Sequence, residues 1–138
     1  MDAQDLAYAL NQIIHNFGAV AVTGGAASGR WMRSSSSGQI QRRMAWLTLA
    51  GWGAQAASGA TFAAISYLTY GRLPDIHGIA LGALCLKIAC AALGVCLCAV
   101  YLARAPAWGD VRGRLTWTAL LVCAVLALGA AAFLRWFS

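Results

Sequence analysis

The sequence has few charged residues, and this shortage limits the class of protein it can be. Only 10% of its 138 residues are charged, whereas soluble domains carry about a quarter. It has no glutamate, and Lys87 is its single lysine. Hydrophobic residues make up 61% of the chain, and the mean hydropathy is +0.67. These few charged side chains cannot cover the surface of a soluble fold of this size. We therefore expect an integral membrane protein.

The sequence also lacks the patterns of common catalytic and nucleic-acid-binding sites. We find no carboxylate dyad, no phosphate-binding glycine loop and no paired nucleophile and base. The net charge of +6 comes from arginines divided between short connecting segments, which is not the pattern of a folded basic module. We therefore expect no enzyme activity and no nucleic-acid partner. The expected partners are membrane lipids and a larger membrane complex.

Long apolar runs predict the fold. Each run can cross a hydrocarbon core of about 30 Å as a helix rising about 1.5 Å per residue. Because lipid offers no hydrogen-bond partner to the backbone, such segments are expected to be helical, and short connections make consecutive helices antiparallel. We predict an all-α, integral membrane four-helix up-down bundle, forming a single transmembrane domain over residues 1–138. The predicted helices are 6–29, 44–70, 76–103 and 115–137.

The arginines predict the orientation. The first and third connections together hold seven of them, and the opposite side holds two, Arg72 and Arg135. By the positive-inside rule, these two connections lie in the cytoplasm and both termini on the outer, periplasmic side. We expect a multi-pass protein of the bacterial inner (cytoplasmic) membrane. The seven arginines are Arg30, Arg33, Arg42, Arg43, Arg104, Arg112 and Arg114.

Several polar side chains interrupt the predicted spans. A lysine at the centre of a span costs about 2.5–3.5 kcal/mol on insertion scales, so such groups are expected to face the bundle interior or a cavity. Counted from the predicted helix ends, His15 lies about 13 Å and Lys87 about 18 Å below the outer surface. We expect these two and Gln55 to form one cluster, reached through a vestibule of other polar groups. The full set is Asn11, Gln12, His15, Asn16, Gln55, His77 and Lys87.

Two of these residues have competing interpretations. Lys87 is either a gate, a ligand-positioning charge or a counter-charge for an anion, or else a lysine that snorkels to the interface. His15 is either a hydrogen-bonded structural histidine, a copper ligand or an axial haem ligand. The spacing of Asn11, His15, Gly18 and Val22 places them on one face of the first helix, which we expect to face the third.

The five cysteines include no CxxC pair, so the sequence predicts neither a zinc site nor a thioredoxin-like motif. Small packing residues are the simpler interpretation. Thiolates also select Cu(I), which makes Cys85, Cys90 and Cys96 possible soft contacts. Cys85 and Cys96 share one helix face but lie three turns apart, too far for one coordination sphere.

One resemblance adds to this interpretation. A histidine followed by a glycine pair, a TYGR turn and a lysine inside the next helix resembles the copper-resistance D-like (CopD-like) family of membrane proteins. These features are His15, Gly24 with Gly25, residues 69–72 and Lys87, and the similarity covers roughly residues 10–105. The resemblance implies an inner-membrane protein for copper uptake or delivery, with His15 as the residue that meets the ion. The chain departs from a dedicated copper carrier because it has no methionine-rich segment.

Three functions follow. The first is copper handling, in which His15 and His77 collect the ion from outside and the cysteines offer softer contacts inward. The second is a haem- or quinone-binding anchor or accessory subunit of a respiratory electron-transfer complex. One haem b iron shared by both histidines is disfavoured, because their predicted depths differ by about 10 Å. The third is a structural accessory subunit without a ligand.

Overall fold

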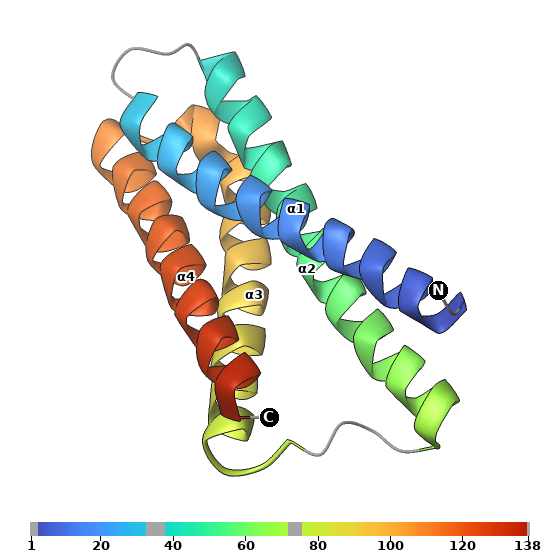
Figure 1. Cartoon of the computed structure of the whole chain (residues 1–138). Helices are drawn as coiled ribbons and strands as arrows, with labels where there is room; N and C mark the ends of the chain where they lie inside the picture. The colour runs from blue at the N-terminus through green and yellow to red at the C-terminus, as the bar shows by residue number, and fades with distance from the viewer. Residues whose placement is uncertain (1–2, 33–37, 72–75, 138) are drawn as a thin grey trace.

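The computed structural model of the chain describes residues 3–32, 38–71 and 76–137. Four long helices follow one another (Figure 1). The part of the chain that the structure describes contains no strand. The all-α prediction and the order of four helices are confirmed. The helices are α1 (Ala3–Trp31), α2 (Gly38–Tyr70), α3 (Gly78–Arg104) and α4 (Asp110–Phe137), with a short 3-10 turn, η2 (Ala105–Ala107), before α4.

The helices extend beyond the apolar runs that predicted them. α2 begins at Gly38 rather than at residue 44, and α4 begins at Asp110 rather than at residue 115. The predicted bounds lie where the charged side chains end, but the backbone hydrogen bonds of a helix do not require apolar side chains. α2 therefore continues through the exposed Arg42 and Arg43.

The end of α2 has a specific backbone cause. Gly71 adopts φ +66, a left-handed conformation that glycine reaches without a steric penalty. Its N–H donates to the carbonyl of Tyr67 at 2.9 Å, which satisfies one of the last free carbonyls of the helix. The chain thereby leaves the helix axis directly after Tyr70.

The helices form two hairpins, α1 with α2 and α3 with α4 (Figure 1). Small residues let α1 and α2 approach closely. A Cβ on Gly51 would lie 2.9 Å from the Val22 side chain, and one on Gly25 would lie 2.4 Å from the Thr48 hydroxyl. Close packing of this kind is typical of helices that associate through backbone contact.

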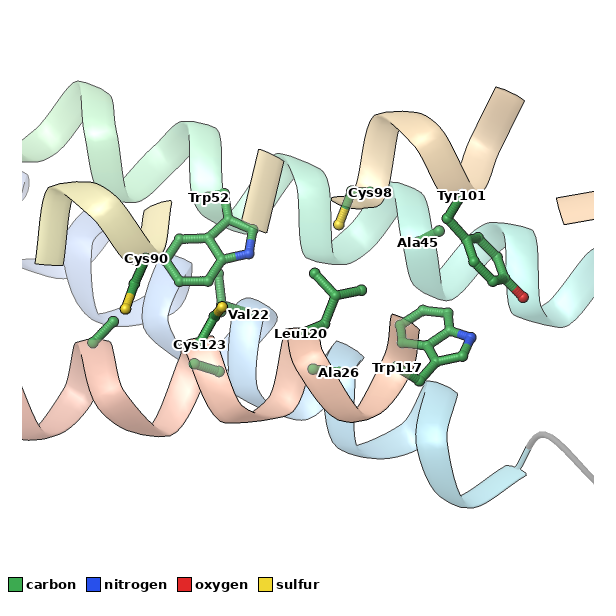
Figure 2. Packing of buried hydrophobic residues seen from close by; sticks show 12 residues of the cluster. Val22, Ala26, Ala45, Trp52, Cys90, Cys98, Tyr101, Trp117, Leu120 and Cys123 are labelled. Atoms are coloured by element: carbon green, nitrogen blue, oxygen red, sulfur yellow. The ribbon is translucent and has the colours of Figure 1, made fainter. Parts of the chain in front are cut away.

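The two hairpins meet over part of their length. Gly94 of α3 lies so close to Trp52 of α2 that an added Cβ would come within 2.4 Å of the indole. Gly29 of α1 packs against Trp117 of α4 in the same way. Figure 2 shows Trp52, Leu120 and Trp117 arranged along this interior. This apolar core joins the hairpins at the end that carries the 31–38 connection and in the middle.

Toward the chain termini the hairpins diverge (Figure 1). No residue of α2 beyond Ser58 is buried, and none of residues 4–10 of α1 is buried. Lys87 lies about 10 Å along α3 from Gly94, on the side where this separation begins. The polar groups predicted in the spans therefore belong to a distinct region, next to the apolar core.

Within the described ranges, two stretches are long and apolar enough to cross a membrane, Gly78–Ala107 and Asp110–Trp136. α1 and α2 have similar lengths but carry more polar side chains in their interiors. These polar side chains are the ones that form the site described next.

Candidate functional site

A contact between Lys87 and His15 connects the hairpins where they begin to diverge. The Lys87 Nζ atom lies 3.0 Å from Nε2 of His15, and both side chains are half-buried. Counted at about 1.5 Å per residue, Lys87 is about 14 Å from the start of α3, and His15 about 18 Å from the start of α1. The pair therefore sits deep within long helices rather than at their ends.

The other side of His15 is fixed by α2. Its Nδ1 atom lies 2.7 Å from the Ser58 hydroxyl, and the Gln55 amide donates to the His15 backbone carbonyl. The Asn11 amide donates to the Ser58 carbonyl at 2.9 Å. Asn11, Gln55 and Ser58 are all buried, so each bond is made away from solvent and holds the two helices in one register.

Aromatic rings continue the site toward the termini. The edge of His15 meets Phe62 with a centroid separation of 5.7 Å and an interplanar angle of 69°. Phe62 stacks on Tyr8 at 6.1 Å and 19°. The polar cluster is therefore flanked by two stacked aromatic rings of the α1–α2 hairpin.

The hydrogen bonds assign the proton on His15. The single hydroxyl proton of Ser58 points to the Ala54 carbonyl, because these oxygens are 2.5 Å apart and only one of them can donate. The Ser58 oxygen must then accept from Nδ1–H of His15. Nε2 consequently carries no proton and accepts from Lys87. The direction of donation is Lys87 to His15 to Ser58 to the Ala54 carbonyl.

Lys87 has no anionic partner among the described residues. The chain contains four aspartates, and neither of the two that the structure describes, Asp5 and Asp110, contacts it. An ammonium at this position has two N–H groups left after donating to His15. These two N–H groups suit a ligand that offers oxygen acceptors.

The structure brings four of the predicted polar residues together and separates three others. His15, Lys87, Gln55 and Asn11 form the cluster. The other three are exposed. Two of them bond to one another, since Gln12 donates to Asn16 at 2.8 Å, and the third, His77, precedes α3 about 15 Å along the axis from Lys87.

The predicted orientation of the α1 face was wrong. Asn11, Gly18 and Val22 pack against α2, and only His15 reaches α3. A Cβ on Gly18 would meet Ala54 at 3.1 Å, for example. The spacing did predict which α1 residues share a face, but consecutive helices pack closest, so this face lies on α2.

The sequence analysis missed Ser58 and Phe62. Together with Gln55 they follow the spacing i, i+3, i+7, which places them on one face of α2, and this pattern was available from the sequence. Serine is easily overlooked because its hydroxyl can bond to the carbonyl four residues earlier and so costs little in an apolar helix.

Some of the cysteines lie on the surface and the others lie in the apolar core. Cys85 and Cys96 are exposed on α3, whereas Cys90 is buried, where it interacts with the thiol of Cys123. Cys85 and Cys96 therefore lie on the outer surface of this chain, and their role as soft contacts for copper stays a prediction.

The residues present do not fit a copper ion or a haem iron at His15. A metal needs the lone pair of a ring nitrogen, but Nδ1 is protonated and Nε2 accepts from Lys87. An ammonium 3.0 Å from Nε2 would also repel a cation. The described part of the chain contains no group of three or more histidine, cysteine or acidic side chains that could hold a metal.

Comparison with known proteins adds no further constraint: no family model, no curated protein and no solved structure matches this chain.

Proposed function

We propose that this chain is a four-span inner-membrane protein that binds the head of a quinone at the Lys87–His15 pair, as an accessory subunit of a larger electron-transfer complex. The observation that carries the proposal is the 3.0 Å contact between Lys87 Nζ and His15 Nε2 deep within the helices. A polar pair of this kind in a membrane span marks a ligand or ion site by default, because its insertion is costly.

The membrane part of the proposal rests on length, composition and polar pairing. α3 and α4 contain apolar stretches long enough to span. α1 and α2 have comparable lengths, and their buried polar groups bond to one another, which removes much of the cost of placing them in lipid. The excess of arginine in the first and third connections supports a cytoplasmic location for both.

A quinone suits the site for three reasons. Its carbonyl oxygens accept hydrogen bonds, which Lys87 can donate. Its flat ring suits stacking on the aromatic rings beside the pair, Phe62 and Tyr8. Its apolar tail would lie in lipid while its head meets the half-buried Lys87–His15 pair, so the ligand needs no aqueous path.

Copper handling, which the CopD-like resemblance implies, remains a separate prediction with less support from the geometry. It would require His15 to release Lys87 before a metal could approach Nε2. The proposal does not depend on the resemblance, and the same purified sample tests both functions.

Binding of a short-chain quinone to the purified protein tests the proposal. We expect Lys87→Met to weaken binding at least about tenfold, because the principal donor is lost, and Lys87→Arg to retain part of it. His15→Gln is expected to weaken binding, and His77→Gln, which changes the exposed histidine, serves as its matched control. Equal binding by the wild type and Lys87→Met would contradict the proposal.

Elemental analysis and an absorption spectrum complete the test. Stoichiometric copper that disappears in His15→Ala, together with no quinone binding, would favour copper handling. A Soret band lost in the same variant would favour haem.

A further inference from the structure

Among the described residues, no negatively charged side chain balances the charge of Lys87. Lys87 is the only cationic side chain that the hydrogen bonds place in the cluster, and its partner His15 is a neutral ring by the assignment above. The remaining polar members, Asn11 and Gln55, are neutral and donate to backbone carbonyls. An ammonium in an apolar environment without a counter-charge tends to lose its proton, so an anion from outside the chain would stabilise its charged form.

Ser58 determines which ring nitrogen of His15 carries the proton. With the hydroxyl in place, Nδ1 donates to Ser58 and Nε2 accepts from Lys87. Without it, the ring can move its proton to Nε2, so that two donors would face each other across the 3.0 Å contact. Ser58 thus keeps His15 as the acceptor that orients the lysine, and two N–H groups of the ammonium remain available.

We infer that the site binds an ionised oxygen on an amphipathic molecule in preference to a neutral carbonyl, and that Ser58 is a positioning residue for this selectivity through the tautomer of His15. The inference rests on the proposed function for its location in the membrane, and it specifies the charge of the ligand. The shared chemistry is an anionic oxygen joined to an apolar body, as in an ionised hydroxyquinone or a fatty carboxylate. The ammonium of Lys87 attracts an ionised oxygen by full Coulomb attraction, which is strong in an apolar environment, whereas a neutral carbonyl offers only a dipole, and this difference is the source of the preference.

Three probes test the inference on the purified full chain. The first is an alkylated 2-hydroxy-1,4-naphthoquinone that is ionised at neutral pH, the second is its neutral methyl ether, and the third is lauric acid. We expect the ionised quinone to bind at least about tenfold more tightly than its methyl ether. Lauric acid binding in competition with the ionised quinone would show that the anionic group is the common determinant.

Variants of α2 separate positioning from general stability. Ser58→Ala is expected to reduce the preference for the ionised quinone, and Ser58→Thr, which keeps the hydroxyl, to restore it. Thr61→Ala is the matched control, because the Thr61 hydroxyl also bonds to a carbonyl one turn earlier but is exposed. In a His77→Gln background, nitrogen NMR shifts of the one remaining histidine should report a protonated Nδ1, and Ser58→Ala should change them.

The outcomes separate this inference from the proposed function. Equal affinity for the ionised quinone and its methyl ether would overturn the anion preference and leave quinone binding intact. Binding of lauric acid but of neither quinone would overturn the proposed function and support the anion site. A protonated Nε2 in the wild type would overturn the role of Ser58, and failure of all three probes would overturn both proposals.

Discussion

Lys87 makes opposite contributions to stability and to the proposed ligand binding. Placing lysine deep in an apolar helix costs about 2.5–3.5 kcal/mol, and the bond from its charged group to the His15 ring returns about 1.5–3 kcal/mol. The residue is therefore a net cost to the fold, which is typical of a group that acts on something outside the chain.

This balance gives a prediction for the ligand-free protein. Lys87→Met should raise the free energy of unfolding in detergent by about 1 kcal/mol, because the insertion cost exceeds the value of the lost hydrogen bond. The measurement is thermal unfolding followed by circular dichroism, with His77→Gln as a surface control. A lower melting temperature in Lys87→Met would mean that the lysine mainly holds the hairpins together.

At the same scale, the sequence predicted the costly members of the site but not the inexpensive ones. Lys87, His15 and Gln55 stood out because each is costly in lipid, and helix rise placed them at similar depths. Ser58 and Phe62 carry no such cost. The proton position on His15 follows from the distance between the Ser58 hydroxyl and the Ala54 carbonyl. No sequence pattern contains such a distance.

At the scale of the helices, contact between the hairpins depends on a few glycines whose absent side chains leave room for indole rings. Gly94 admits Trp52, and Gly29 admits Trp117. The sequence indicated close approach through its many small residues, but not which glycines serve it. Gly24 and Gly82 have no neighbour within 4 Å of an added Cβ, although they look equivalent in the sequence.

This difference predicts a matched pair of variants. Gly94→Ala should destabilise the protein by about 1–3 kcal/mol, because the new Cβ would come within 2.4 Å of the Trp52 indole and force the hairpins apart. Gly82→Ala, on the same helix with open space around it, should be neutral or slightly stabilising. Thermal unfolding and tryptophan fluorescence of both variants provide the measurement. Equal effects from the two substitutions would contradict the packing of α3 on Trp52.

At the scale of the whole molecule, the distribution of polar groups relates the fold to the membrane. The interior nearer the 31–38 connection holds the hydrophobic cluster with Trp52 and Trp117, whereas the interior toward the termini holds the Lys87–His15 cluster. Two of the helices contain stretches long and apolar enough to cross a membrane, and polar side chains of the other two bond across their shared contact. Hydropathy alone therefore supports the proposed spans of α3 and α4 better than those of α1 and α2.

Labelling of single cysteines from one side of the membrane tests the proposed topology. In a version with the five native cysteines replaced, His77→Cys should react with an impermeant maleimide added to spheroplasts, because the second connection is proposed to lie outside. Gly38→Cys and Gly109→Cys should react only after lysis, because they border the arginine-rich connections proposed to lie in the cytoplasm. All three positions are exposed, so burial within the protein would not prevent labelling. The reverse pattern would contradict the orientation, and labelling of His77→Cys and Gly109→Cys from the same side would contradict a membrane-spanning α3.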